Sequence, residues 1–239
     1  MVTAKDPNHV WHIDLTAVPI GGGFWPPPLP FALPQRWPFC WWLAVIIDHY
    51  SRRAMGFAVF PGRPNSLAVR AFLGKAIARA NAMPKHLICD KDSIFWCAAF
   101  KRWCRRKGIR PRFGAVGEHG SIAVVERLIR TMKDEATRSI VVPQRQTRFR
   151  TELTSFFAWY NEHRPHTTLQ GKTPNEVYFR LRSANQRPRI EPRKRWPRPS
   201  PCANPCTLIA GQPGDRFTLQ VDFYVARRHL PIVLLKRAA

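Results

Sequence analysis

Residues 10–18, VWHIDLTAV, alternate between apolar and polar side chains. Such alternation predicts a β-strand with one buried face. The apolar face would carry Trp11, Ile13, Leu15 and Ala17, and the polar face His12, Asp14 and Thr16. Aspartate is disfavoured at the centre of a strand, so Asp14 either lies on an exposed edge or has a functional role.

Two more strands follow. Residues 40–49 are almost entirely apolar, which is typical of a central strand, and residues 54–60 form the third strand. The intervening segment, residues 21–39, is rich in glycine and proline and excludes a regular element. We therefore expect a long insertion loop inside a hairpin.

Helices and strands then alternate. Ser66 is positioned to cap a first helix, and residues 86–89 form a short strand with Asp90 at its carboxyl end. A second helix would turn four side chains inward and end at Gly108, before a strand at residues 109–113; the four are Trp96, Phe100, Trp103 and Cys104. This order predicts a mixed five-stranded sheet flanked by helices.

The segment GSIAVVERLIRTMKDE, residues 120–135, has helical periodicity. Its core stripe consists of Val125, Leu128, Ile129 and Met132. Glu126, Arg130 and Lys133 form the neighbouring stripe. An exposed Glu126–Arg130 ion pair would explain this stripe at a gain of only about 0.3 kcal/mol, and a functional carboxylate is the alternative.

Composition changes towards the carboxyl end and predicts four regions. These are an extension at residues 1–9, a core at 10–179, a basic Pro/Arg-rich linker at 180–206 and a small β module at 207–239. In the last region Phe217, Leu219, Val221, Phe223 and Val225 alternate with polar residues, which predicts a strand.

The charge of the chain points to a polyanionic partner. Thirty-nine Lys and Arg against fifteen Asp and Glu give a net charge of +24, and nucleic acid is the commonest polyanion in a cell. A soluble basic protein or one bound to acidic membranes is the alternative. The segment KRWCRRKGIRPR, which includes Arg105, Arg106 and Lys107, favours DNA phosphate contacts. No apolar run is long enough to span a membrane, and no secretory signal is evident, so we expect a cytoplasmic or nucleoid location.

Three carboxylates on neighbouring elements, Asp14, Asp90 and Glu126, would repel one another without a cation. Hard oxygen ligands suit Mg²⁺ or Mn²⁺.

These residues lie in an ordered set of motifs. The set comprises VWHIDLT, IIDHYSRRAMGF, HLICDKDSIF, GSIAVVER and AWYNEHRPHTTLQGKTPNEVYF. Thirty-five residues separate Asp90 from Glu126. The set resembles the catalytic core of DDE transposases and retroviral-type integrases, whose fold is RNase H-like.

The resemblance implies metal-dependent DNA strand cleavage and strand transfer. Asp14 would bridge two Mg²⁺ or Mn²⁺ ions, Asp90 would hold one and Glu126 the other, and Lys133, with Arg130 beside it, would grip DNA. It also implies action as a homo-oligomer on element ends and target DNA. An RNase H-like nuclease, and a truncated or decayed element product that binds DNA without catalysis, are the alternatives.

The chain departs from the family pattern at four places, the first of which is the insertion at residues 21–39, longer than usual and a candidate contact for DNA or a partner subunit. Asp92 stands where a glycine is usual and is an alternative ligand to Asp90; Ile122 stands where an asparagine is common. The chain begins almost at the first catalytic strand, so we expect a shortened gene, a fragment or a protein that relies on a separate DNA-binding chain.

Overall fold

The structure is a computed structural model that describes residues 4–21, 37–114, 122–181 and 216–237. The chain forms two compact units, Met1–Leu153 and Thr154–Ala239, and the division between them falls inside one long helix. The first unit contains the sheet and all three predicted catalytic carboxylates.

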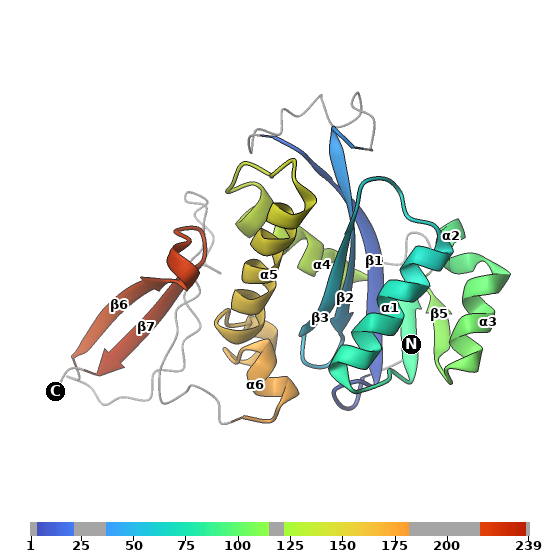
Figure 1. Cartoon of the computed structure of the whole chain (residues 1–239). Helices are drawn as coiled ribbons and strands as arrows, with labels where there is room; N and C mark the ends of the chain where they lie inside the picture. Colours follow the sequence, from blue (N-terminus) through green and yellow to red (C-terminus); the bar gives the residue numbers. More distant parts are fainter. Residues whose placement is uncertain (1–3, 22–36, 115–121, 182–215, 238–239) are drawn as a thin grey trace. The chain divides into compact units, whose positions relative to one another are not determined.

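The first unit is built on a five-stranded sheet of order β3-β2-β1-β4-β5 (Figure 1). Its strands are β1 (Val10–Pro19), β2 (Cys40–Asp48), β3 (Ala54–Phe60), β4 (His86–Cys89) and β5 (Arg110–Phe113). The first three strands pair antiparallel, and β1, β4 and β5 pair in parallel. This confirms the predicted mixed sheet and places β1 at its centre.

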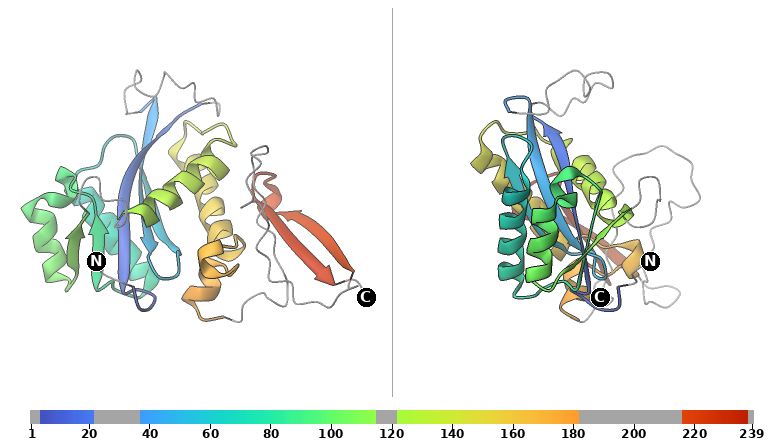
Figure 2. Two further views of the ribbon diagram at one scale, coloured as in Figure 1. Left: turned by 180° about the vertical axis from the view of Figure 1, so that it is seen from behind. Right: turned by 90° about the vertical axis from the view of Figure 1, so that its right-hand side faces the viewer.

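Helices cover both faces of this sheet. The helices are α1 (Ser66–Ala80), α2 (Ser93–Trp96), α3 (Ala98–Arg106), α4 (Ala123–Met132), a π-helical turn (Lys133–Thr137) and α5 (Gln146–Glu162). Helices α1 and α3 lie on one face and α4 packs against β1 and β2 on the other (Figure 2). The predicted core stripe of α4 is buried.

Because helices cover both faces of the sheet, the prediction that β1 buries only one face is wrong. His12, on the supposedly exposed face, has no solvent-accessible surface. Its Nε2 lies 2.7 Å from Nδ1 of His49, and burial lowers the pKa of His12 to about 3, with the nearby charges of His49 and Arg52 acting in the same direction. A central strand therefore buries polar side chains that alternation alone assigns to solvent.

Two helix predictions are also corrected. Asn65, not Ser66, caps α1, because its Oδ1 accepts the Ala68 amide at 2.9 Å. The predicted helix through Trp96 and Phe100 is interrupted at Cys97, whose backbone is extended (φ −64°, ψ 152°). The break leaves Trp96 48% exposed, whereas Phe100 is fully buried as predicted.

The second unit holds the end of α5, a 3-10 turn (Thr167–Leu169) and α6 (Pro174–Tyr178). Thr173 and Glu176 form a capping box at the start of α6: the Thr173 amide donates to Glu176 Oε2 at 2.8 Å, and the Glu176 amide donates to Thr173 Oγ1 at 3.3 Å. Both residues are buried. The capping box therefore sets where α6 begins and the direction in which the chain enters it.

A two-stranded antiparallel sheet follows, made of β6 (Phe217–Phe223) and β7 (Pro231–Arg237), joined through a 3-10 turn (Tyr224–Ala226). The predicted β module is thus present within the described residues. Four of its alternating apolar residues, Leu219, Val221, Phe223 and Val225, are each at least 45% exposed. A two-stranded sheet has no second layer of its own to cover that face.

Several predictions fall outside the described residues. They concern most of the insertion at 21–39 and most of the basic linker at 180–206. The domain limits 1–9, 10–179, 180–206 and 207–239 stay predictions. Within the described ranges, no helix combines the length and apolar character that crossing a membrane requires.

Candidate active site

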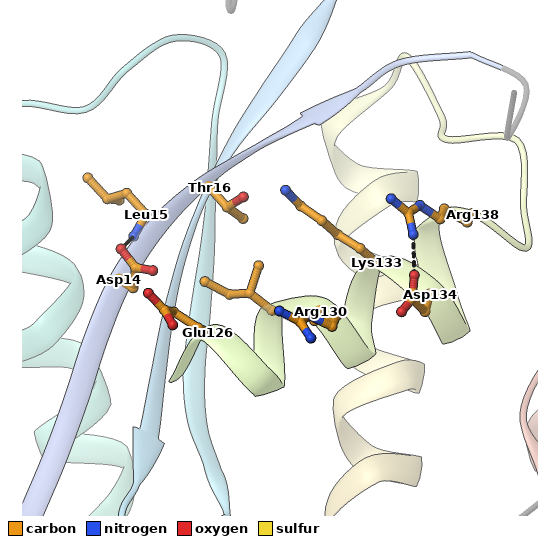
Figure 3. Close-up of a pocket in the computed structure, with 9 residues that line it drawn as sticks. Asp14, Leu15, Thr16, Glu126, Arg130, Lys133, Asp134 and Arg138 are labelled. Carbon is orange, nitrogen blue, oxygen red and sulfur yellow. Dashed lines mark hydrogen bonds and ion pairs between the residues drawn. The ribbon is translucent and has the colours of Figure 1, made fainter. Parts of the chain in front are cut away.

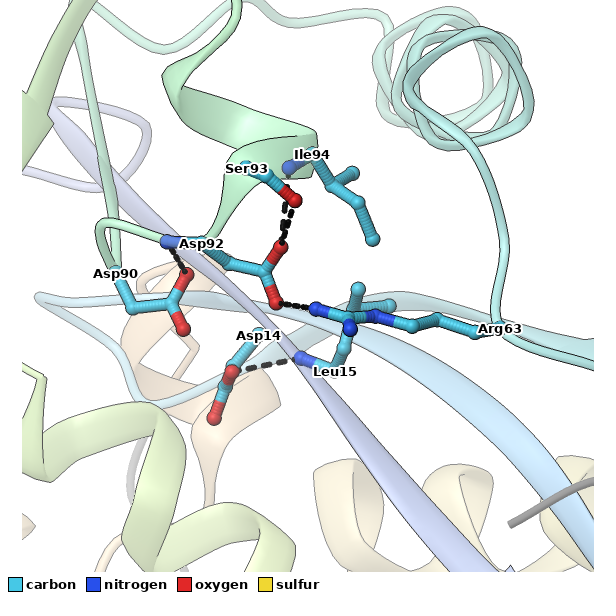
Figure 4. A network of polar contacts seen from close by, with 7 residues as sticks. All are labelled: Asp14, Leu15, Arg63, Asp90, Asp92, Ser93 and Ile94. Carbon is cyan, nitrogen blue, oxygen red and sulfur yellow. Dashed lines mark hydrogen bonds and ion pairs between the residues drawn. The ribbon is translucent and has the colours of Figure 1, made fainter.

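The parallel register of β1 and β4 brings the first two carboxylates together. His12 of β1 pairs with Ile88 of β4, so two residues further along Asp14 stands level with Asp90, just past the end of β4. Paired residues in a sheet point to the same face. The two carboxyl groups lie near one another in Figure 4.

Helix α4 supplies the third carboxylate. Burial of Val125 and Ile129 against the sheet fixes the rotation of the helix and leaves Glu126 exposed in its first turn. Glu126 and Asp14 point toward one another across an open pocket of about 310 Å³ (Figure 3). The pocket is lined by Asp14, Leu15, Thr16, Glu126, Ile129, Arg130, Lys133, Asp134 and Arg138.

Asp14 is the electrostatic centre of this pocket. Its pKa is raised from 3.8 to about 7, mainly by burial and also by the charges of Asp90 and Glu126, whereas the Leu15 amide, 2.7 Å from Oδ1, and the charge of Lys133 oppose the rise. The negative charges of Asp90 and Glu126 therefore both act on Asp14. A cation among them would relieve the repulsion that raises this pKa.

Basic side chains line the other end of the pocket. Arg130 and Lys133, which the sequence places on one helical stripe with Glu126, both line this end of the pocket (Figure 3). Burial lowers the pKa of Lys133, and the positive charge of Arg138 lowers it further, against the attraction of Asp14.

Arg138 and its ion-pair partner Asp134 were not predicted. In an α-helix of 3.6 residues per turn, Arg138 would lie about 140° around the axis from Lys133. The Arg138 amide instead donates to the Lys133 carbonyl at 2.9 Å, five residues back. This π-helical turn brings the two side chains to the same side, and 3.6-residue periodicity cannot reveal it.

Asp92, the alternative to Asp90, has its carboxylate already engaged (Figure 4). Its Oδ1 accepts the Ile94 amide at 3.0 Å and the Ser93 hydroxyl at 3.2 Å, and its Oδ2 pairs with the Arg63 guanidinium. Burial alone would raise the pKa of Asp92, but the Ile94 amide and Arg63 outweigh it and hold the pKa below its ordinary value.

The pKa of Asp90 shifts in the opposite direction. Burial raises its pKa, and the charge of Asp92 adds to the rise, while the Asp92 amide and Arg63 oppose it. Its Oδ1 accepts the Asp92 amide at 3.2 Å. The geometry therefore favours Asp90 over Asp92 as the carboxylate that faces Asp14.

The donor set suits a hard divalent cation in its chemistry, because three carboxylates supply only oxygen ligands and have electrostatic need of a positive charge. Among the described residues, however, no group of three His, Cys, Asp or Glu side chains is gathered tightly enough to hold a metal ion. Asp14, Asp90 and Glu126 are neighbours without forming a closed cage.

The remaining predicted residues lie elsewhere. Arg105, Arg106 and Lys107 are exposed at the carboxyl end of α3 and do not line the pocket. Ile122, which precedes α4, makes no side-chain capping hydrogen bond.

Comparison with known proteins gives two matching profiles, both described as "Integrase core domain", over residues 4–119 and 107–174. The chain is 28% identical over 144 residues to the transposase InsD for insertion element IS2A/D/F/H/I/K of Escherichia coli, which covers 58% of this chain and 47% of that protein. The same figures hold for InsD of element IS2D from strain K12. The chain spans between about half and two thirds of the length of the curated relatives it matches, with coverages of 47% and 65%.

Solved structures share the fold. The HTLV-2 integrase catalytic core domain in complex with magnesium aligns with a TM-score of 0.54 at 16% identity, covering 74% of this chain and 99% of that one. The catalytic core domain of BIV integrase aligns with a TM-score of 0.51 at 22% identity, covering 72% and 95%. A simian T-cell lymphotropic virus intasome structure aligns with a TM-score of 0.60 at 17% identity, covering 100% and 81%. The chain thus has the RNase H-like fold of integrase cores.

Proposed function

Since this chain belongs to the integrase core domain family, we propose that it catalyses divalent-cation-dependent phosphoryl transfer on DNA, as a transposase or integrase core. The observation that carries the proposal is the meeting of Asp14, Asp90 and Glu126 from three separate elements, with the pKa of Asp14 raised through burial and through both neighbours. Perturbed carboxylates gathered in a pocket are typical of catalytic sites.

Asp14 and Asp90 would hold the cation from the sheet side, and Glu126 from α4 would complete the oxygen ligands. A bound Mg²⁺ or Mn²⁺ would supply Lewis-acid chemistry, activating an attacking water or hydroxyl and offsetting charge on the leaving oxygen. In the absence of the cation, burial and the charges of Asp90 and Glu126 favour the protonated form of Asp14, whose pKa is raised to about 7. We therefore expect the site to be organised for catalysis only in the presence of the ion.

The basic end of the pocket would bind the DNA backbone. Arg130, Lys133 and Arg138 line the pocket together with the carboxylates. Phosphate contacts of this kind position nucleic acid without reading its sequence. The exposed cluster Arg105, Arg106 and Lys107, at the carboxyl end of α3 on the other face of the sheet, would make phosphate contacts separate from the pocket.

DNA is the proposed partner, and a homo-oligomer the proposed working form. The supporting observations are the net charge of +24 and the similarity to a protein seen in an intasome and to a core domain seen in a dimeric form. We also propose a cytoplasmic or nucleoid location, which the proposed DNA substrate and the similarity to InsD transposases of Escherichia coli support.

A branched DNA that mimics a joined product tests the activity, because it needs no knowledge of element ends. Labelled substrate is incubated with the full chain and Mg²⁺ or Mn²⁺, and strand resolution is followed on a denaturing gel. Glu126→Gln removes a proposed ligand. Glu162→Gln is the matched control, because Glu162 on α5 is 58% exposed and lies outside the pocket.

We expect metal-dependent products from the wild type and the Glu162→Gln control, and none from Glu126→Gln, which should still bind DNA. A folded wild type that binds DNA but yields no product would favour the binding-only alternative. Equal activity of Glu126→Gln would remove Glu126 from the site.

A further inference from the structure

The segment that follows β4 is held by a network that the proposed chemistry does not use (Figure 4). The Asp92 amide donates to Oδ1 of Asp90 at 3.2 Å, so the backbone of Asp92 orients the catalytic carboxyl group. The side chain of Asp92 caps α2 by accepting the Ile94 amide at 3.0 Å. A displacement of Asp92 would therefore disturb the hydrogen bond that orients the Asp90 carboxyl group.

Arg63 supplies the second anchor for Asp92. It lies in the connection between β3 and α1 and forms an ion pair with Asp92 Oδ2. Its guanidinium carbon also lies 5.7 Å from the centre of the Trp42 ring on β2, so the cation rests on the sheet as well as on its partner. The side chain of Arg63 is 54% exposed and that of Asp92 18% exposed.

Both oxygens of Asp92 are thus engaged by protein donors. A metal ion at Asp92 would have to displace a guanidinium, whereas a metal ion at Asp90 would leave the network intact. Hydrogen-bond partners behind a ligating carboxylate fix its direction and strengthen metal binding.

We propose that Arg63 and Asp92 form a positioning pair that holds the Asp90 carboxylate toward Asp14 for cation binding. The proposal rests on the proposed function, because it assigns the pair a role toward the same metal site. Neither residue touches the reacting groups: Arg63 acts through Asp92, and Asp92 through its amide and its cap on α2.

Simple electrostatics makes a different prediction. If only charge mattered, Arg63→Ala would leave an additional negative charge near the site and tighten cation binding, whereas Asp92→Asn would leave an additional positive charge and weaken it. If Asp92 were itself a ligand, Arg63→Ala would free its carboxylate and again tighten binding. Positioning predicts that both substitutions weaken binding.

A direct measurement of Mn²⁺ affinity distinguishes these three predictions and does not depend on catalytic activity. The free ion is titrated by electron paramagnetic resonance with the full chain and with Arg63→Ala, Asp92→Asn and the double variant. Asp92→Asn keeps an N-cap oxygen for Ile94, because Asn and Asp are equivalent caps, but it removes the ion pair. Arg63→Lys tests partial rescue, and Arg79→Ala, an exposed arginine at the end of α1, is the matched control.

We expect each single variant to raise the Kd for Mn²⁺ about tenfold, and the double variant to be no weaker than the poorer single one, since the two residues act as a unit. Arg63→Lys should recover part of the loss, and Arg79→Ala should match the wild type. Thermal denaturation of each variant would show that it is folded.

Tighter Mn²⁺ binding by Arg63→Ala, or unchanged binding by both single variants, would overturn the positioning pair while leaving the metal site in place. Loss of DNA affinity by Arg63→Ala with unchanged Mn²⁺ affinity would overturn it too, and would make Arg63 a DNA contact. No Mn²⁺ binding by the wild type would overturn the proposed metal site together with the pair.

Discussion

Replacing Asp14 by Asn should change how the stability of the metal-free protein depends on pH. The pKa of Asp14 is raised from 3.8 to about 7 in the folded chain, first by burial and then by Asp90 and Glu126. The unfolded chain has the ordinary value. A group whose pKa is raised on folding adds stability below its unfolded pKa, and that stability is lost as the pH rises through its folded pKa.

The size of the effect follows from the shift. A change of about 3 units at 1.36 kcal/mol per unit corresponds to about 4 kcal/mol between low pH and pH above 7. Between pH 5 and pH 8 the expected loss is about 3 kcal/mol, because the unfolded carboxyl group is already ionised at pH 5. Domains are stable by only about 5 to 15 kcal/mol, so such a loss is measurable.

Urea denaturation at pH 5 and pH 8 in the presence of a chelator measures the effect. The Asn variant cannot ionise, so its free energy of unfolding should fall about 3 kcal/mol less than that of the wild type between these two pH values. Asp222→Asn, an exposed aspartate on β6, should follow the wild type. Added Mg²⁺ at pH 8 should stabilise the wild type but not Asp14→Asn. Parallel pH profiles for wild type and Asp14→Asn would refute the electrostatic account of the pocket.

Three further predictions concern other parts of the chain. Thr173→Ala should lower the free energy of unfolding by about 1 kcal/mol through loss of the α6 cap, whereas Thr173→Ser should not; urea denaturation decides, and equal loss in both would contradict the capping role. Arg138→Gln should raise the pKa of Lys133, because Arg138 lowers it; slower acetylation of Lys133 at pH 8, followed by mass spectrometry, would show this, and an unchanged rate would contradict it. Replacing the α3 cluster by alanine should weaken DNA binding regardless of sequence and reduce the slope of log affinity against log salt by about 3; an unchanged slope would remove the cluster from the interface. The cluster is Arg105, Arg106 and Lys107.

The sheet could be predicted from the sequence because its strands are bounded by clear turns and buried by apolar runs. Residues 54–60 and 86–89 were predicted as strands, and β3 and β4 have those bounds. The register of β1 and β4 then placed Asp14 level with Asp90, which strand order alone could not establish. The stripe of α4 predicted the direction of Glu126, because only one rotation buries Val125 and Leu128.

The features that the sequence did not predict share a physical cause. They depend on contacts or backbone conformations that local periodicity does not encode. The break at Cys97 turns Trp96 outward within a pattern that favours a continuous helix. The π-helical turn changes the side on which Arg138 lies. Asp92 and Arg63 are separated by 29 residues in the chain, so their pairing emerges only from the packed structure.

The most direct test of the three-carboxylate metal site is the position of the ion itself. Crystals of the full chain soaked in Mn²⁺ would be measured for anomalous scattering from the metal. We predict a peak about 2.1 Å from carboxylate oxygens of both Asp14 and Asp90, on the side that faces Glu126. A peak bound to Asp92 in place of Asp90, or no peak in this pocket at saturating Mn²⁺, would contradict the site.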